Sequence, residues 1–272
     1  MSEAIDRLVQ VMARLRDKDK GCPWDLEQNF KTIAPHTLEE TYEVVEAIES
    51  GDPKAMKDEL GDLLFQVIFH AQMGREGGLF TLDEIATHVA DKMIERHPHV
   101  FADRDASTAG AVVVNWEQDK AAKREAQARA ENRPISALDG VSTALPAATR
   151  AVKLQNRAAR VGFDWADARD ILAKIKEEIA ELEAEMKSAD QDAIEDEFGD
   201  LFFALVNLAR RLEVDPETAL RRTNRKFERR FREIEKRLAA NGRAMGDASL
   251  DEMENIWRAI KDEEKRVKKA AS

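Results

Sequence analysis

The sequence predicts an all-α fold built from two tandem copies of one helical domain. Gly, Pro and Tyr are scarce, at 12, 7 and 1 of 272 residues, which disfavours an architecture of strands and tight turns. Apolar residues recur at helical spacing along most of the chain, and charged residues make up 36% of it, as expected for long exposed helices. An acidic pattern in the first half also returns in the second half.

Four helices are predicted in the first half. The first carries an apolar stripe over residues 8–15, and the second is expected from about residue 35 to residue 49. The third opens at an Asp-Pro dipeptide, residues 52–53, which supplies the N-cap and the first helical residue. A capping box of Thr81 and Glu84 starts the fourth. The remaining segments are predicted loops at 74–78 and 104–110, and a stretch at 111–114 that is too short to assign as a strand.

The second half repeats this scheme after a linker. Residues 120–136 are charged and Ala-rich and lack an apolar stripe, and Pro134 and Gly140 punctuate the end of this stretch, where we place the domain boundary. We therefore predict an N-terminal domain over residues 1–130, a linker over 131–140 and a C-terminal domain over 141–272. The second-half helices are expected at 144–160, 167–187, 190–212, 216–240 and 250–268.

Composition limits the classes of partner. The formal net charge of −11 disfavours nucleic acid as the main partner, because phosphate backbones would be repelled. Cys22 is the only cysteine, so no intrachain disulfide is expected, which fits a reducing cytosol. The charged N-terminal helix lacks the apolar region of a signal peptide, and the apolar stretches are too short to cross a bilayer. We expect a cytoplasmic protein without a membrane partner.

The internal repeat is most regular in its acidic residues. Each copy reads Glu-Glu-x-x-Glu, continues over 16 positions from the last of these acids, and then reads Glu-x-x-Asp. The copies consist of Glu39, Glu40, Glu43, Glu59 and Asp62, and of Glu177, Glu178, Glu181, Glu197 and Asp200. Basic and aromatic landmarks return in the same order as Lys92, Arg96, Trp116 and Lys120, and as Lys226, Arg230, Trp257 and Lys261.

The spacing of the acids predicts a metal site in each half. Residues three apart share a helix face, and a short turn between the two helices predicts an antiparallel hairpin, so four carboxylates can converge. Four like charges at close range require protonation or a cation, and Mg²⁺ or Mn²⁺ suits an all-oxygen set. The alternative is a solvated acidic face, which is the more common reading of one copy alone. The equal spacing in two copies favours the metal site.

Other residues leave alternatives open. A di-iron bundle needs Glu-x-x-His, but the histidines lie only in the first half and none is repeated, and the segment 97–99 is interpreted as a helix exit. The repeated basic residues favour a polyphosphate site over surface ion pairs. Trp165 can stack on a base, but a place in the core is the preferred interpretation.

With these residues in place, the chain resembles the MazG family of nucleoside triphosphate pyrophosphohydrolases, in its long tandem-domain bacterial form. The family pattern of Glu-Glu-x-x-Glu followed by Glu-x-x-Asp stands twice in this sequence. The resemblance covers nearly the whole chain, and the further similar stretches are 21–25, 37–43, 96–101, 161–165 and 224–233.

The resemblance implies an all-α fold in which helical hairpins from two subunits form a four-helix bundle, and therefore a homodimer. It also implies hydrolysis of nucleoside triphosphates between the α- and β-phosphates, giving nucleoside monophosphate and pyrophosphate, with Mg²⁺ as cofactor and Mn²⁺ as a substitute. The C-terminal half is the expected hydrolytic one, although the first half carries every acid.

The resemblance also implies roles for individual residues. Glu177 and Glu39 are candidates to orient or deprotonate a metal-bound water, with Glu178 the central catalytic and metal-binding acid. The implied metal ligands are Glu178, Glu181, Glu197 and Asp200, with Glu40, Glu43, Glu59 and Asp62 as their first-half equivalents. The implied substrate-binding residues are Lys226, Arg230, Trp257 and Lys261, with Lys92, Arg96, Trp116 and Lys120 equivalent.

Two other classes of function stay open from the residues. A nucleotide sensor would bind triphosphate without turnover, and a helical dimerisation or regulatory module would bind no metal. The preferred base and a role in nucleotide-pool cleaning or in stress signalling do not follow from these patterns.

Overall fold

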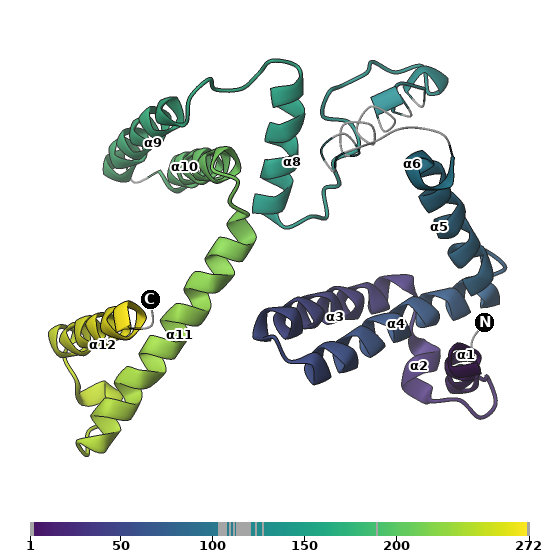
Figure 1. The fold of residues 1–272 in the computed structure, drawn as a ribbon, viewed down its shortest axis with the longest axis horizontal. Helices are drawn as coiled ribbons and strands as arrows, with labels where there is room; N and C mark the ends of the chain where they lie inside the picture. Colours follow the sequence, from purple (N-terminus) through teal and green to yellow (C-terminus); the bar gives the residue numbers. More distant parts are fainter. Residues whose placement is uncertain are drawn as a thin grey trace. The chain divides into compact units, whose positions relative to one another are not determined.

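The computed structural model of this chain describes residues 3–102, 108, 110, 112, 121, 122, 124–126, 128–188 and 190–270. The described residues form helices joined by loops and turns, and none of them lies in a strand, which confirms the predicted all-α class (Figure 1). The chain divides into two compact units, a first unit of Met1–Asp119 and a second unit of Lys120–Ser272. The domain limits and linker predicted from the sequence stay a prediction.

The first unit is centred on a hairpin of two long helices. Helices α3 and α4 lie side by side, joined by a tight turn at Gly51 in the left-handed conformation (φ 72°), and α1 packs on α4 (Figure 1). Its core consists of Met12, Ile33, Ile68, Phe69 and Met73. The helices are α1 (Glu3–Leu15), α2 (Pro23–Glu27), α3 (Phe30–Ser50), α4 (Pro53–Glu76), α5 (Leu82–Arg96) and α6 (Pro98–Phe101).

The second unit repeats the hairpin and adds a second helix pair. Helices α9 and α10 form the hairpin, α8 packs on α10, and α11 and α12 pack together around Ile234, Leu238 and Ile260 (Figure 1). The helices are α8 (Ala147–Arg160), α9 (Ala168–Ser188), α10 (Gln191–Arg211), α11 (Pro216–Ala240), the 3-10 helix η1 (Met245–Asp247) and α12 (Leu250–Ala270).

Several predicted boundaries differ from the structure. The second predicted helix begins at Phe30 rather than near residue 35, because Asn29 and Thr32 form a capping box upstream of Pro35, which lies inside the helix. The short helix α2 was not predicted. The predicted loop at 74–78 is wrong at its start, because α4 continues through Glu76. Helix α5 ends at Arg96, as the predicted helix exit at 97–99 requires, but Pro98 then begins the short helix α6, which was not predicted.

Gly74 shows why α4 ends as it does. A Cβ at this position would lie 2.4 Å from a ring carbon of Phe80, so the missing side chain lets the following segment fold back against the helix.

Among the described helices, none has the length and apolarity to cross a membrane. The predicted cytoplasmic location stays a prediction. Of the stretch at 111–114, all but Val112 lies outside the described residues.

Candidate active site

The α9–α10 hairpin brings three acids of the second unit together. Carboxylate oxygens of Glu178, Glu197 and Asp200 lie within 4.8 Å of one another, although they come from two helices. Glu178 is 5% exposed, whereas Asp200 is open to solvent. The i, i+3 spacing of Glu197 and Asp200 places both on the α10 face that meets α9. The hairpin expected from the short turn therefore builds an oxygen-only ligand set.

The first unit builds the same kind of cluster. Carboxylate oxygens of Glu40, Glu43 and Glu59 lie within 4.8 Å of one another on α3 and α4. Each group omits one of the four acids that the family resemblance implies as metal ligands, Asp62 in the first unit and Glu181 in the second. Both omitted acids are exposed on the same hairpins as their groups.

The carboxylates in each cluster affect one another's pKa. Desolvation, followed by the negative charges of Asp62, Glu43, Glu59 and Glu39, raises the pKa of Glu40. Desolvation and then the neighbouring acids, Glu43 first, also raise the pKa of Glu59. In the second unit, partial desolvation and the Glu178 carboxylate raise the pKa of Glu181, against the opposing charge of Lys174. The omitted acids Asp62 and Glu181 are therefore electrostatic members of the clusters.

A lysine neutralises part of the second cluster. Lys174 lies one turn before Glu178, and its Nζ is 2.8 Å from Glu178 Oε1 and 2.6 Å from Glu177 Oε1. These hydrogen bonds, with that to Glu177 the stronger, raise the pKa of Lys174. In the first unit, His36 takes this place one turn before Glu40, and its Nδ1 lies 3.5 Å from Glu39. Glu177 in the second unit and Glu39 in the first, the acids that precede the cluster residues, therefore each have a basic neighbour.

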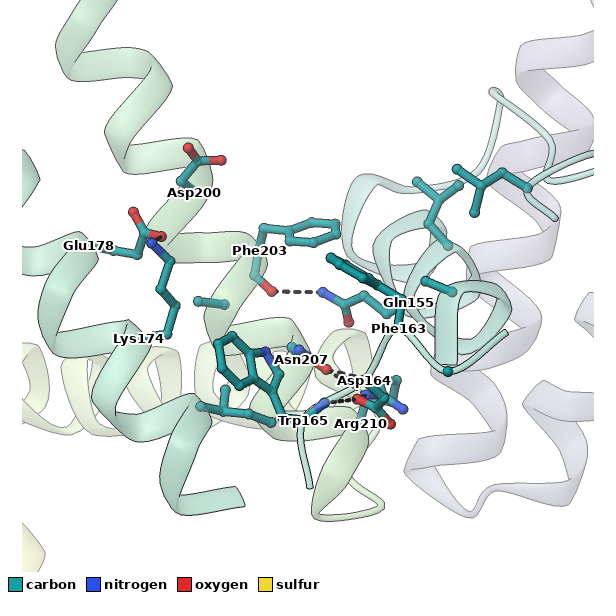
Figure 2. A pocket seen from close by; sticks show the side chains of 16 residues that line it. Gln155, Phe163, Asp164, Trp165, Lys174, Glu178, Asp200, Phe203, Asn207 and Arg210 are labelled. Carbon is teal, nitrogen blue, oxygen red and sulfur yellow. Dashed lines mark hydrogen bonds and ion pairs between the residues drawn. The ribbon is translucent and has the colours of Figure 1, made fainter. Parts of the chain in front are cut away.

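A cavity of about 660 Å³ adjoins the second cluster. Its size is within the ~300–1,000 Å³ typical of small-molecule sites. Figure 2 shows Glu178 and Asp200 on one side of the cavity, Gln155 and Phe163 on the other, and Trp165 lower in the view. Apart from Leu138, which precedes α8, the lining comes from α8, the loop after it, α9 and α10.

The loop that carries Trp165 is tied to α10 by an ion pair. Arg210 contacts the Asp164 carboxylate, and both side chains are largely buried, at 10% and 21% exposed. Partial burial raises the pKa of Asp164, but the hydrogen bond and charge of Arg210 outweigh it and leave the pKa below its ordinary value. Asn207 in turn accepts two hydrogen bonds from Arg210, at 3.0 and 2.8 Å.

The equivalent place in the first unit is filled with apolar side chains. The acids of the two hairpins match at a constant offset of 138 positions, so Phe69 on α4 corresponds to Asn207 on α10. Phe69 is 1% exposed and packs with Met12, Ile33 and Ile68 in the core. The acids therefore repeat between the units, but the polar lining around Asn207 does not.

The predicted basic residues of the second unit lie on α11 and α12. Arg230 forms an ion pair with Glu264 at 2.7 Å, and its guanidinium lies 5.2 Å from the centroid of the Trp257 ring. Lys226 and Lys261 are exposed and have no ion-pair partner in the described part of the chain. Within one chain, the contacts of Arg230 and Trp257 do not include the acid cluster.

The corresponding residues of the first unit are only partly described. Lys92 and Arg96 are half-buried on α5, which packs on α4. Trp116 and Lys120 lie outside the described residues.

The structure adds residues that the sequence reasoning did not select. Lys174 stands four residues before Glu178, and that spacing alone could have indicated the contact. Gln155 and Asn207 carry no local signal, because their role depends on packing between distant helices. The preferred core interpretation of Trp165 is wrong, because this side chain is 44% exposed and lines the cavity.

The fold and the site together define a tandem all-α protein with an acidic ligand set in each helical hairpin, one of them beside a cavity of nucleotide size. The sequence profile of the MazG nucleotide pyrophosphohydrolase domain matches this chain twice, over residues 28–101 and 167–234. The chain belongs to the MazG nucleotide pyrophosphohydrolase family.

Relatives match over nearly the full length of this chain. The chain is 50% identical to the nucleoside triphosphate pyrophosphohydrolase of Escherichia coli (strain K12), covering 96% of this chain and 98% of that protein. It is 38% identical to the nucleoside triphosphate pyrophosphohydrolase/pyrophosphatase MazG of Thermotoga maritima, covering 94% and 95%. It is also 42% identical to the uncharacterized protein YabN of Bacillus subtilis, covering 90% of this chain and 49% of that protein.

Proposed function

We propose that this chain is a Mg²⁺-dependent hydrolase that splits nucleoside triphosphates into nucleoside monophosphate and pyrophosphate. The observation that carries the proposal is the position of Glu178, Glu197 and Asp200, which converge at the edge of a cavity of about 660 Å³. The names of the Escherichia coli and Thermotoga maritima relatives support the class of substrate. Cleavage between the α- and β-phosphates is the finer part of the proposal.

The acid cluster fits a hard divalent cation. Its ligands are carboxylate oxygens that lie within 4.8 Å of one another, and neither sulfur nor imidazole belongs to the set. Desolvation and the neighbouring carboxylates raise the pKa of Glu181, so a bound cation would stabilise its charged form. When bound, Mg²⁺ would neutralise phosphate charge and lower the pKa of a coordinated water.

The protein's own residues have separate tasks in this proposal. Glu178, Glu181, Glu197 and Asp200 hold the cation, and Glu177 accepts the proton of the attacking water. Lys174 orients Glu177, because its ammonium donates a hydrogen bond to that carboxylate at 2.6 Å. The water oxygen bonds to the α-phosphorus as the bond from that phosphorus to the oxygen bridging the α- and β-phosphates breaks, and pyrophosphate leaves. Positioning and charge supply most of the acceleration.

The phosphates need cations beyond the metal. Lys226 and Lys261 are exposed and free of ion pairs in the described part of the chain, so they remain able to hold phosphate oxygens. Arg230 already contacts Glu264 and the Trp257 ring, so in the absence of substrate it holds the Trp257 side chain in place. Lys92, Arg96, Trp116 and Lys120 are the proposed counterparts in the first unit.

We assign hydrolysis to the second unit. Both units have acid clusters, but only the second has the polar lining around Asn207, since Phe69 fills the equivalent place in the first. Because Phe69 fills the place that Asn207 lines in the second unit, we propose that the first unit binds metal and serves stability or assembly. This difference addresses a question that the acid pattern alone left open.

We also propose a homodimer. Apolar side chains remain exposed on the hairpins of both units, and burying them against a second copy would remove this surface from water. They are Leu38, Tyr42, Leu60, Leu64, Ile179, Phe198, Phe202 and Leu205. Pairing of hairpins across two subunits would give the four-helix bundle that the family resemblance implies.

A product assay tests the function. Purified protein is incubated with Mg²⁺ and each of the common nucleoside triphosphates, and the products are separated. Monophosphate with pyrophosphate is expected, whereas diphosphate with orthophosphate would overturn the site of cleavage. Binding without turnover would favour a nucleotide sensor. No calorimetric signal with either Mg²⁺ or triphosphate would favour a dimerisation or regulatory module.

Matched variants test the assignment to one unit. Glu178→Gln removes a charge from the second cluster, and Glu40→Gln makes the same change at the equivalent place in the first. Glu178→Gln is expected to abolish turnover, and Glu40→Gln to leave most of it. Equal losses in both variants would show that the first unit takes part in hydrolysis.

A further inference from the structure

The cavity contains a buried hydrogen-bond acceptor without a partner. Gln155 is 5% exposed, and its Nε2 donates a hydrogen bond of 2.9 Å to the backbone carbonyl oxygen of Phe203. This bond fixes the amide and leaves Oε1 buried with no hydrogen-bond partner (Figure 2). A buried carbonyl oxygen without a partner is costly, so this position favours a ligand that donates a hydrogen bond.

A donor faces the same cavity from α10. Asn207 uses its Oδ1 to accept two hydrogen bonds from Arg210, so its Nδ2 is the group left for a ligand. Figure 2 shows this nitrogen on the side of Asn207 that is turned toward Trp165. The cavity therefore presents one acceptor, from Gln155, and one donor, from Asn207.

The remaining walls suit a flat aromatic ring. Trp165, Phe163 and Phe203 line the cavity, and Phe163 is 82% exposed although it is a large apolar side chain. Exposed aromatic rings at the edge of a cavity provide surfaces on which a planar ligand can stack. Glu178 and Asp200 line the same cavity, so a ring bound here lies next to the acids.

We propose that this cavity binds the nucleobase of the substrate, and that Gln155 and Asn207 contact its hydrogen-bonding edge. This inference rests on the proposed hydrolysis of nucleoside triphosphates and specifies how the site holds them. Each common base presents an N–H donor beside an acceptor on its Watson–Crick edge, which matches the acceptor and donor of the cavity. The triphosphate then extends toward Glu178 and Asp200, and turnover of all the common bases is expected.

Reversing the donor tests the contact with Asn207. Asn207→Asp keeps the oxygen that accepts from Arg210 but replaces the amide nitrogen with a second acceptor. Guanine alone among the common bases offers two adjacent donors, N1–H and the 2-amino group. The ratio of kcat/KM for GTP to that for ATP is expected to rise about tenfold, which is the selectivity of one hydrogen bond of ordinary strength. An unchanged ratio across ATP, GTP, CTP and UTP would overturn the proposal.

A substrate analogue without a base tests Gln155. Gln155→Met removes the acceptor while keeping a side chain of similar length, and it is expected to raise KM for nucleoside triphosphates about tenfold. Inorganic tripolyphosphate lacks a base, so its inhibition constant against the same reaction should not change. Gln191→Met, on an exposed turn of α10 outside the cavity, is the control. Equal weakening of both ligands in Gln155→Met would mean that Gln155 only supports the fold.

Failure of the proposed function and failure of the base contact give different experimental results. Absence of pyrophosphate release by the wild-type chain with every triphosphate would refute the proposed function, and with it this inference. Normal hydrolysis by the wild type would refute the base contact alone if Asn207→Asp left the GTP-to-ATP ratio unchanged and Gln155→Met did not weaken nucleoside triphosphates selectively. Circular dichroism of each variant establishes that the helices are retained before the kinetic comparison.

Discussion

The ion pair between Asp164 and Arg210 connects the stability of the second unit to the shape of its cavity. It ties the loop of Phe163 and Trp165 to α10, and the same Arg210 orients Asn207. Asp164→Asn retains the size of the side chain and an oxygen that can accept from the Trp165 backbone N–H. It removes the charge that Arg210 contacts, so Arg210 is left largely buried with a weaker partner.

The expected loss follows from the burial of both groups. Hydrogen bonds to charged groups contribute about 1.5–3 kcal/mol, and the low exposure of this pair limits screening by solvent. A loss of roughly 2 kcal/mol lowers the unfolding temperature by about 4–8 °C for a unit of this size. The loop that carries two cavity walls is also released, so KM for nucleoside triphosphates is expected to rise with little change in kcat.

The pH dependence provides a second test. Arg210 lowers the pKa of folded Asp164 below the ordinary value of 3.8, so the ion pair stabilises the protein fully above that value. Its contribution is lost as the pH falls through the lowered pKa. Differential scanning calorimetry should therefore give a constant difference between wild type and Asp164→Asn from pH 8 to pH 5, and a smaller difference toward pH 3.

Asp167→Asn is the matched control. Asp167 makes a similar ion pair with Arg169, but Arg169 is 85% exposed and only two residues away. This variant should unfold within a degree or two of the wild type. Unfolding of Asp164→Asn at the wild-type temperature, or a deficit that persists unchanged at pH 3, would refute the argument.

Three further predictions follow from the same structure. Asn207→Phe puts the first-unit residue into the second unit and should block hydrolysis. It should also lower the unfolding temperature, because Arg210 loses the two hydrogen bonds that Asn207 accepts. Retained kcat/KM in the folded variant would contradict the assignment of the cavity. Glu264→Gln should destabilise the α11–α12 pair by about 1 kcal/mol at pH 7. Hydrogen bonds from Arg230 and then Arg229 lower the pKa of Glu264 to about 2, so the difference should disappear as the pH falls from 4.5 to 2; a constant difference in denaturant unfolding would count against the pair. Gly74→Ala should cost about 1–3 kcal/mol because its Cβ would meet the Phe80 ring, whereas Gly61→Ala, with nothing within 4 Å, should be neutral or stabilising by thermal unfolding.

The acid clusters were predictable because local geometry determines them. Glu197 and Asp200 are three residues apart, and a short turn places α10 beside α9, so the convergence with Glu178 follows from helix period and loop length. The start of α3 at Phe30 was also encoded locally, in the capping box of Asn29 and Thr32. The predicted start near Pro35 lies five residues too late, because Pro35 stands inside the helix rather than at its first turn.

The cavity was not predictable in the same way. The hydrogen bond from Gln155 to Phe203 joins residues 48 positions apart, and the contact of Arg210 with Asp164 spans 46. No periodic pattern encodes such distances, because they depend on how α8 and the following loop pack on α10. The prediction that Trp165 lies in the core is wrong for the same reason. The side chain lines a cavity wall, which is apolar but exposed to solvent.

The proposed function separates metal binding from nucleotide binding between the two hairpins of one chain. Each presents three acids whose oxygens lie within 4.8 Å, so electrostatics favour a divalent cation in both. In the second unit Asn207 lines the cavity proposed for the base, and in the first unit Phe69 fills the equivalent place. A chain with two cation sites and one nucleotide site would therefore bind Mg²⁺ at both hairpins but retain triphosphate only at the second. The acidic motif alone is thus a marker of the cation, and the residue seven positions after its final Asp distinguishes the hairpin that can also hold the substrate.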